Sequence, residues 1–200
     1  KAKTFRHQMY DDYKATRKPM PDDLSEQIKP IYDFLEALNM KFYKKDGYEA
    51  DDILGTIAKK IRNEKLQVYL YSSDKDLMQL VDENIFIYSP GNRFSKTTIY
   101  NEIEVFEKWK VYPNEIVDYL SLVGDTSDNV PGVKGVGKKT ATTLISEYHS
   151  IENLYESINN IKNEKMKQKL ENSKDNAFLS KKLIKLDLNV EVDFALEDMN

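Results

Sequence analysis

The sequence contains no cysteine and only two histidines, and this scarcity restricts the chemistry that the chain can support. Without cysteine it can form no disulfide framework, no thiolate nucleophile and no sulfur-ligated zinc site. The two histidines, His7 and His149, stand far apart in the sequence and are a poor basis for a zinc enzyme. Any metal ion that the chain binds must therefore be held by oxygen ligands.

Long apolar runs are missing as well. No stretch approaches the roughly 20 apolar residues that a membrane-spanning helix needs, and the charged start from Lys1 to Arg6 is not followed by the apolar stretch of a signal peptide. We therefore expect a soluble, cytoplasmic protein with no membrane partner. The chain also opens without a methionine, so we expect it to be a fragment of a longer protein.

Positive charge is not in excess, because 30 basic and 34 acidic residues leave a net charge of -4. The chain has 200 residues, of which 40% are hydrophobic, and this is enough for one large domain or two small ones. If such a protein binds nucleic acid, the contacts must come from local basic patches rather than from the overall charge.

The hydrophobic pattern predicts an α/β region over residues 1–113, with strands that alternate with helices. We expect a basic helix at the start, an amphipathic helix over residues 22–38 that packs on a core, a helix with an acidic N-terminus after Gly47, a further helix after residue 76, and strands at 41–44, 67–72 and 85–88. This alternation indicates βαβ units and a parallel sheet.

A helical region is predicted over residues 114–200. Helices at 115–123 and 139–148 flank a glycine-rich connector over residues 132–137. Further helices are expected between residues 151 and 186, and a short strand at 190–192 ends the pattern.

Three acidic clusters stand out, each at the start of a helix, after a strand or in a turn. They are Glu49, Asp51 and Asp52; Asp74 and Asp76; and Asp125 and Asp128. Each cluster alone has an ordinary explanation, since acids complement a helix N-terminus, cap a turn or favour a loop. In a parallel sheet, however, the loops after the strands meet at one edge, so at least the first two clusters can face the same crevice.

Carboxylates gathered in this way repel one another unless cations lie between them. Magnesium and manganese prefer oxygen ligands, and short aspartate side chains at loop ends suit them. Two such ions about 3.5 to 4 Å apart can stabilise the attacking and leaving oxygens of a phosphoryl displacement. The acidic clusters therefore favour phosphodiester hydrolysis with two divalent cations, Mg²⁺ or Mn²⁺.

The glycine-rich connector predicts a contact with a nucleic-acid backbone. Gly132, Gly135 and Gly137 allow close approach, the following helix offers free amides, and the charge comes from Lys134, Lys138 and Lys139. The alternative is a tight turn with solvated lysines. A dinucleotide-binding loop is disfavoured because a helix, not a strand, precedes the connector.

The basic opening segment is the third candidate. Arg6, Tyr10, Lys14 and Arg17 are spaced for one helical face, and Tyr13 adds an aromatic ring beside Lys14. Such a mixture stacks on bases while it contacts phosphates, whereas the alternative is a solvated face.

Six segments, in order and at compatible spacings, resemble a known family. They are Thr4-Phe5-Arg6-His7, Tyr13-Lys14-Ala15-Thr16-Arg17, Gly47-Tyr48-Glu49-Ala50-Asp51-Asp52, Ser73-Asp74-Lys75-Asp76-Leu77, Gly124-Asp125-Thr126-Ser127-Asp128-Asn129-Val130-Pro131-Gly132 and Gly135-Val136-Gly137-Lys138-Lys139-Thr140-Ala141. Together they resemble the 5′ nuclease domain of bacterial DNA polymerase I, which belongs to the 5′-to-3′ exonucleases and flap endonucleases.

The resemblance implies a three-layer, PIN-like α/β core with a parallel sheet, followed by an all-α helix-hairpin-helix (H3TH) domain. It implies a first metal held by Glu49, Asp51 and Asp52 with Asp74 shared, and a second metal held by Asp76, Asp125 and Asp128.

The resemblance also assigns residues to DNA. Lys14, Arg17 and Asp74 would act at the scissile phosphate, and Tyr13 would stack beside them. DNA contacts are expected at Arg6, Tyr10, Tyr13, Lys14, Arg17, Gly132, Lys134, Gly135, Gly137, Lys138, Lys139 and Thr140, and a potassium ion is expected at the hairpin. The expected partners are 5′ flaps and nicked or branched duplexes, a covalently linked polymerase domain and a nucleoid setting.

One departure leaves alternatives open. The family begins with two further βα segments, each of which brings an aspartate to the first metal site, so we expect this chain to bind branched DNA and to hydrolyse it slowly. A second hypothesis is a DNA-junction-binding module without catalysis. A third is a haloacid-dehalogenase-like phosphatase built on Asp74 and Asp76, which would leave the other clusters unexplained.

Overall fold

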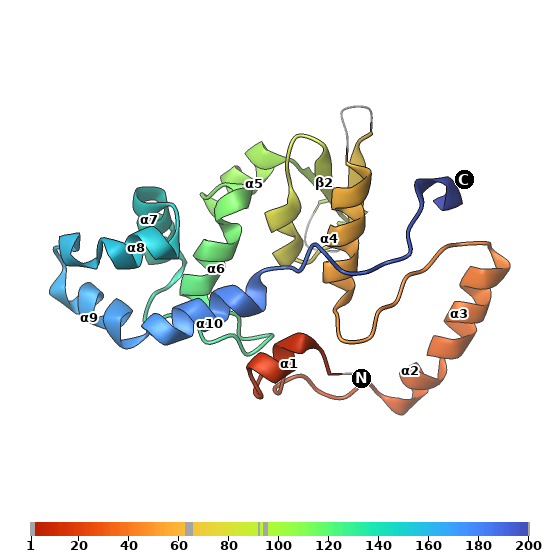
Figure 1. The fold of residues 1–200 in the computed structure, drawn as a ribbon, viewed down its shortest axis with the longest axis horizontal. Coiled ribbons are helices and arrows are strands. Elements are labelled where there is room, and N and C mark those ends of the chain that lie inside the picture. Colours follow the sequence, from red (N-terminus) through yellow and green to blue (C-terminus); the bar gives the residue numbers. More distant parts are fainter. Residues whose placement is uncertain (1–2, 63–65, 92, 94–95, 200) are drawn as a thin grey trace.

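In the computed structural model of the chain, residues 3–62, 66–91, 93 and 96–199 are described. The elements form an elongated arrangement in which helices α7 to α9 lie at one end and α2 and α3 at the other (Figure 1). The predicted α/β region followed by a helical region is confirmed. Within the described residues, no helix is long and apolar enough to cross a membrane.

The sheet has three strands in the order β1-β2-β3, namely β1 (Val68–Tyr71), β2 (Ile85–Ser89) and β3 (Thr98–Tyr100). Strands β1 and β2 are parallel, with Val68 opposite Ile85, whereas β2 and β3 are antiparallel. The expected parallel sheet is therefore mixed in the described part. Strand β3 is too short to have produced a clear alternating pattern.

Two helices and a 3₁₀ helix flank or join these strands. They are α4 (Ala50–Ile61) before β1, the 3₁₀ helix η1 (Asp76–Leu80) between β1 and β2, and α5 (Glu102–Trp109) after β3. The N-terminus of α4 has a capping box in which the side chain of Asp52 accepts a hydrogen bond from the backbone amide of Glu49.

The helical half begins with η2 (Pro113–Glu115) and α6 (Ile116–Val123). It continues with α7 (Lys138–Tyr148), α8 (Ile151–Glu156), η3 (Ile158–Asn160), α9 (Glu164–Asn172), α10 (Lys174–Ile184) and η4 (Leu196–Met199). The helices predicted at 115–123 and 139–148 are confirmed, and so is the connector between them.

A single hydrophobic core runs through both halves of the chain. Ile87 of the sheet, Leu122 of α6 and Leu154 of α8 are all fully buried and belong to the same packed cluster. Helix α10 packs against α6. The boundary that we place at residue 113 remains a prediction, because the core itself is continuous.

The N-terminal part differs from the sequence-based expectation. Only α1 (Phe5–Met9) is helical in the opening basic segment, whose residues 1 and 2 lie outside the described residues. The segment at 22–38 forms α2 (Asp22–Glu26) and α3 (Ile28–Ala37), and neither helix has a buried residue, so the expected packing on the core is wrong. The described residues 41–44 and 190–192 form no strand.

Candidate metal and nucleic-acid site

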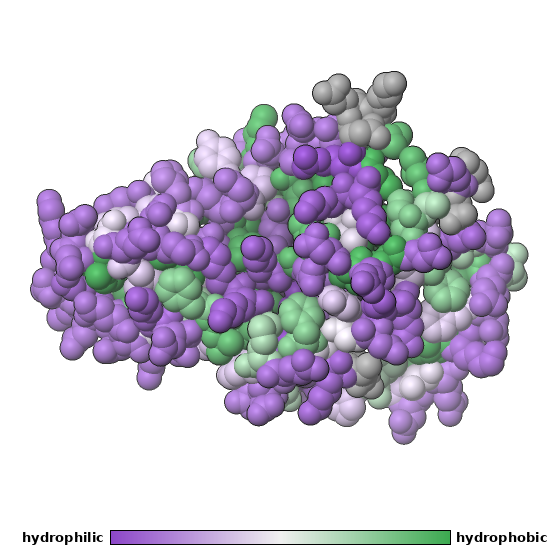
Figure 2. Space-filling view, viewed as in Figure 1, coloured by the Kyte–Doolittle hydropathy of each residue, from purple (hydrophilic) through white to green (hydrophobic). Residues whose placement is uncertain are grey.

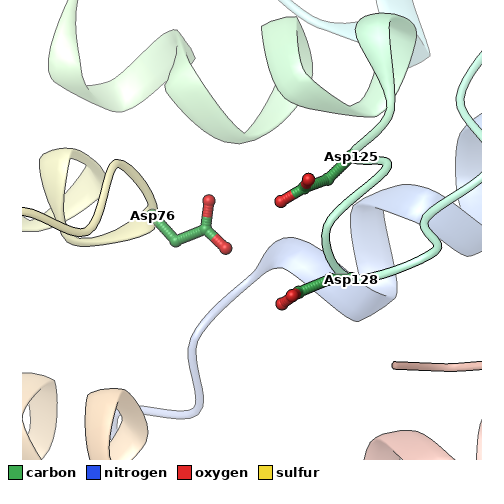
Figure 3. Close-up of side chains that lie close together, drawn as sticks. All are labelled: Asp76, Asp125 and Asp128. Carbon is green, nitrogen blue, oxygen red and sulfur yellow. The ribbon is translucent and has the colours of Figure 1, made fainter. Parts of the chain in front are cut away.

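Three aspartates from two separate parts of the chain meet beside the sheet edge. Asp76 begins η1 just after β1, while Asp125 and Asp128 lie in the loop after α6. One carboxylate oxygen from each lies within 4.8 Å of the others, and Figure 3 shows the three side chains converging. We call these three residues the acidic trio. Its convergence matches the second of the two metal sites expected from the sequence.

The loop that carries Asp125 and Asp128 is held by close backbone contacts. Asp125 and Val130 exchange backbone hydrogen bonds of 2.9 and 2.7 Å, and the Ser127 amide donates to Asp125 Oδ1 at 2.8 Å. A Cβ on Gly132 would come within 2.5 Å of the Gly124 nitrogen. Gly132 is buried and its amide donates to Ser180 Oγ at 2.9 Å, so in this structure it serves packing, and its expected DNA contact stays a prediction.

Three basic side chains lie against the acids. Lys75 pairs with Asp125 and lies 3.6 Å from Asp76, and Arg17 pairs with Asp128. Lys14 bridges two clusters, with its Nζ 3.3 Å from Asp128 and 2.5 Å from Glu49. These contacts place cations where the negative charge is most concentrated.

The charges in the trio are unequal. Burial raises the pKa of Asp76 to about 7; the charge of Lys75 opposes this rise, and the charges of Asp74, Asp125 and Asp128 add to it. Burial also opposes ionisation of Asp125, but the hydrogen bond and the charge of Lys75 outweigh it and lower the pKa of Asp125. Asp76 thus gives up its proton only near neutral pH.

The first acidic cluster lies next to the trio. Glu49 precedes α4 and accepts from Lys14 and, at 3.0 Å, from the Tyr13 hydroxyl, which also lies 3.5 Å from Asp128. Burial, followed by the charges of Asp74 and Glu49, raises the pKa of Asp51 to about 6.

Asp74 is exposed and accepts from the Asp76 amide at 3.0 Å. The structure therefore brings Glu49, Asp51 and Asp74 into electrostatic contact, as the sequence predicted for the first two clusters.

Asp52 is paired with a basic side chain instead, so in this geometry it is not placed to act as the metal ligand that the resemblance implies. Its side chain is fully buried and forms a fork-like ion pair with Arg6, at 2.7 and 2.8 Å. Burial would raise the pKa of Asp52, but Arg6 outweighs that effect and lowers it. Only 1% of the Arg6 side chain is exposed, so this structure does not present it to DNA, and its expected DNA contact stays a prediction.

The rest of the opening segment is a folded turn. Tyr13 is buried with 4% of its surface exposed, so this structure does not present the ring to a base, and its expected stacking stays a prediction. Burial raises the pKa of Tyr13 well above its usual value. Lys14 has a left-handed φ of 57° and its amide donates to the Asp128 carbonyl at 2.9 Å, while Tyr10 is half-buried. Only Arg17 of the predicted helical face is well exposed.

The connector between α6 and α7 presents its polar residues outward. Lys134, Lys138 and Lys139 are exposed, as are Gly135 and Gly137, while Thr140 is half-buried. Two valines of the connector, at 133 and 136, are buried and anchor it to the core. Figure 2 shows a hydrophilic surface over most of the end formed by α7 to α9. This geometry leaves the predicted backbone contact available.

One functional candidate escaped the sequence analysis. Lys75 stands between Asp74 and Asp76 in the chain, and the structure places its ammonium on Asp125, 50 residues away. A lysine flanked by two acids after a strand was the available signal.

The fold and the site define a class of protein, an α/β unit with an acidic cluster followed by a helical unit, and comparison with known proteins identifies the family. Residues 1–110 match the family model of the 5′-3′ exonuclease N-terminal resolvase-like domain, and residues 111–200 match that of the 5′-3′ exonuclease C-terminal SAM fold. The chain therefore belongs to the 5′-3′ exonuclease family.

Relatives of known sequence agree with this family. The chain is 41% identical over 192 residues to DNA polymerase I of Caldicellulosiruptor bescii. This match covers 95% of the chain and 22% of the polymerase. The chain is also 37% identical over 203 residues to a 5′-3′ exonuclease of Buchnera aphidicola. This match covers 98% of the chain and 70% of the exonuclease. The chain thus spans about a fifth of the polymerase relative.

Solved structures share the fold. A flap endonuclease of bacteriophage T5, described as a pseudo-enzyme-product complex with DNA and metal ions, matches with a TM-score of 0.75 and 22% identity. The match covers 94% of this chain and 71% of the phage protein. The catalytic core of Rad2 in complex with DNA substrate matches with a TM-score of 0.60 and 15% identity.

Proposed function

We propose that this chain is a metal-dependent nuclease unit that hydrolyses DNA phosphodiester bonds at 5′ ends or 5′ flaps. The observation that carries the proposal is the acidic trio, whose oxygens lie within 4.8 Å of one another and face three cationic side chains. Family membership and the DNA and metal named for the phage T5 structure support it.

The donor set fits hard divalent cations such as Mg²⁺ or Mn²⁺, because only carboxylate oxygens are presented. Asp76, Asp125 and Asp128 would hold one ion. Glu49, Asp51 and Asp74 would hold a second, without Asp52. When bound, such ions stabilise the charge that develops on the attacking and leaving oxygens of a phosphodiester.

The side chains around the acids would bind and orient the DNA strand. Lys14 and Arg17 lie on the acids and are placed to pair with a phosphate when metal ions take over the carboxylates. The connector would hold a duplex through Lys134, Lys138 and Lys139 and through its backbone amides, and its backbone carbonyls would accommodate a potassium ion. Nicked and branched duplexes are therefore the proposed substrates, and the proposed setting is a longer polymerase that acts in replication and repair.

The test is cleavage of a 5′-labelled flap with and without Mg²⁺ or Mn²⁺. We expect short labelled products only with metal, and a loss of at least a hundred-fold in Asp128→Asn, because that change removes a charged ligand of the trio. Asp46→Asn, at an exposed aspartate outside the cluster, is the control and should cleave normally.

A DNA-binding module without catalysis is the second candidate, favoured by the exposed lysines of the connector. It predicts retained binding to branched DNA in Asp128→Asn and no metal-dependent product from the unaltered chain.

A further inference from the structure

The buried ion pair between Arg6 and Asp52 joins three parts of the chain that are distant in sequence. The two residues are 46 positions apart, and both are withdrawn from solvent. Neither touches the acidic trio. The pair therefore needs an explanation other than a direct contact with metal or DNA.

Each oxygen of Asp52 accepts two hydrogen bonds. Oδ2 accepts from Arg6 at 2.7 Å and from the Glu49 backbone amide at 3.0 Å. Oδ1 accepts from Arg6 at 2.8 Å and from the Asp187 backbone amide at 2.9 Å. The carboxylate is thereby saturated, and it ties the start of α4 to the segment that follows α10.

Arg6 makes matching contacts on its other side. Its Nε donates to the Leu183 carbonyl at 2.7 Å and Nη2 donates to the Lys185 carbonyl at 3.1 Å. Its Nη1 lies 3.6 Å from Glu49 Oε2. A planar guanidinium can serve all of these acceptors at once, which the single ammonium of a lysine cannot do.

These contacts continue to the acidic trio through Glu49. The carboxylate of Glu49 is shared by Lys14 and Tyr13, and both of these side chains also approach Asp128. A continuous set of polar contacts therefore runs from the end of α10, through Arg6 and Asp52, to the acids.

We propose that Arg6 and Asp52 form a positioning pair that holds Glu49 and the start of α4 in register with the acidic trio. The proposal rests on the proposed metal-dependent function. A buried ion pair by itself adds little net stability compared with apolar side chains of similar size, because desolvation offsets its attraction. What apolar side chains cannot replace is the fixed direction of the Glu49 and Asp187 amides.

The experiment compares metal affinity and amide protection in variants of the 200-residue chain. Arg6→Met with Asp52→Leu removes the pair and fills its volume, and Arg6→Lys keeps the charge without the fork. Arg62→Met, which removes another arginine–aspartate pair at the surface, is the matched control. Mn²⁺ binding is measured by calorimetry, amide exchange by NMR without metal, and folding by circular dichroism.

We expect the Arg6→Met/Asp52→Leu double variant to fold. It should bind Mn²⁺ about ten-fold more weakly, a loss typical when residues that orient metal ligands are removed. The amide hydrogens of Glu49 and Asp187 should exchange with solvent faster than in the parent. Arg6→Lys should weaken Mn²⁺ binding by a smaller factor, and Arg62→Met should change neither quantity. If the double variant fails to fold, Arg6→Lys carries the test.

Two results would overturn the proposal. One is unchanged Mn²⁺ affinity in every folded variant of the pair, which would make the pair purely structural. The other concerns the two single variants, Asp52→Leu and Arg6→Met, measured in the same way. Abolished Mn²⁺ binding in Asp52→Leu together with normal Mn²⁺ binding in Arg6→Met would make Asp52 a ligand. If the unaltered chain bound no Mn²⁺, the proposed function would fail, while the metal-free amide exchange would still decide whether the pair fixes Glu49.

Discussion

Asp76 shows how the environment of a single carboxyl sets its chemistry. The side chain is four-fifths buried and shares its surroundings with other acids, and its pKa rises to about 7. Its ionised form is therefore costly in the folded chain and less costly in the unfolded chain. A bound cation would offset this cost by stabilising the ionised carboxylate. A hydrophobic side chain at the same place could not bind a cation.

The first prediction follows from that pKa. Because the folded pKa lies above the unfolded value of 3.8, the stability contributed by protonated Asp76 is fully present below about pH 4 and is lost as the pH rises to about 7. Asp76→Asn should therefore raise the free energy of unfolding at pH 8 without metal by on the order of 2 to 4 kcal/mol. The gain should shrink steadily between pH 7 and pH 4.

Urea unfolding at pH 4.5, 6 and 8 in the presence of a chelator measures this effect. Asp46→Asn is the control, and its stability should follow that of the parent at each pH. Equal stability of the parent and Asp76→Asn at pH 8 would show that ionising Asp76 carries no free-energy cost in the folded chain.

At the scale of elements, the connector between α6 and α7 separates two kinds of glycine. Gly135 has a φ of 80° and a Cβ there would lie 3.1 Å from the Lys169 ammonium, which itself lies 3.4 Å from the Gly135 carbonyl. Gly137 has a φ of -97° and no atom lies within 4 Å of its potential Cβ. Gly137 is thus free of folding constraints that Gly135 carries.

The second prediction uses this difference. Gly137→Ala should leave the thermal stability almost unchanged but weaken duplex binding several-fold, because the added methyl group would keep a DNA backbone away. Fluorescence anisotropy with a labelled duplex measures the affinity. Normal affinity in Gly137→Ala would exclude a close approach of DNA at this position.

The lysines of the same connector permit a separate measurement. Lys134→Ala should weaken binding about equally for all duplex sequences and reduce the slope of log K against log salt by about one. Lys60→Ala, at an exposed lysine on α4 whose ammonium contacts the Val192 carbonyl, should leave the slope unchanged. An unchanged slope in Lys134→Ala would mean that Lys134 is a solvated lysine of a tight turn and contacts no phosphate.

At the scale of the whole molecule, the core crosses the boundary between the two matched family regions. Trp109 of α5 packs against Tyr119 of α6, with ring centroids 6.1 Å apart, and the buried cluster extends from Tyr13 to Leu186. Polar contacts of Arg6 with the end of α10 connect the halves a second time. The two regions are therefore one packed body in this chain.

The third prediction is a single cooperative unfolding transition. Trp109 is the only tryptophan and its fluorescence reports on the end of the α/β half, while far-UV circular dichroism reports on the helices of both halves. The two midpoints should coincide in the parent, and both should fall together in Leu122→Ala, which should cost about 2 to 5 kcal/mol. Separate midpoints for the two probes would show that the halves unfold independently.

The sequence by itself determined the features that depend on local pattern. Helical periodicity located α6 and α7, and the acidic residues marked the start of α4 and the end of β1 as candidate sites. Glu49, Asp51 and Asp74 do meet, but not for the reason expected, because no strand forms at residues 41–44 before Glu49. Features that follow from residues a few positions apart are visible in a single sequence.

Only the tertiary structure decided which charged residues face each other. The spacing of Arg6, Lys14 and Arg17 suggested one helical face, yet Arg6 is buried on Asp52 and Lys14 turns through a left-handed conformation to reach Asp128. A basic residue in a linear pattern has the same appearance whether its partner is DNA, water or an acid from a distant segment. The choice depends on burial and on the net field of the assembled acids, and these exist only after the chain has folded.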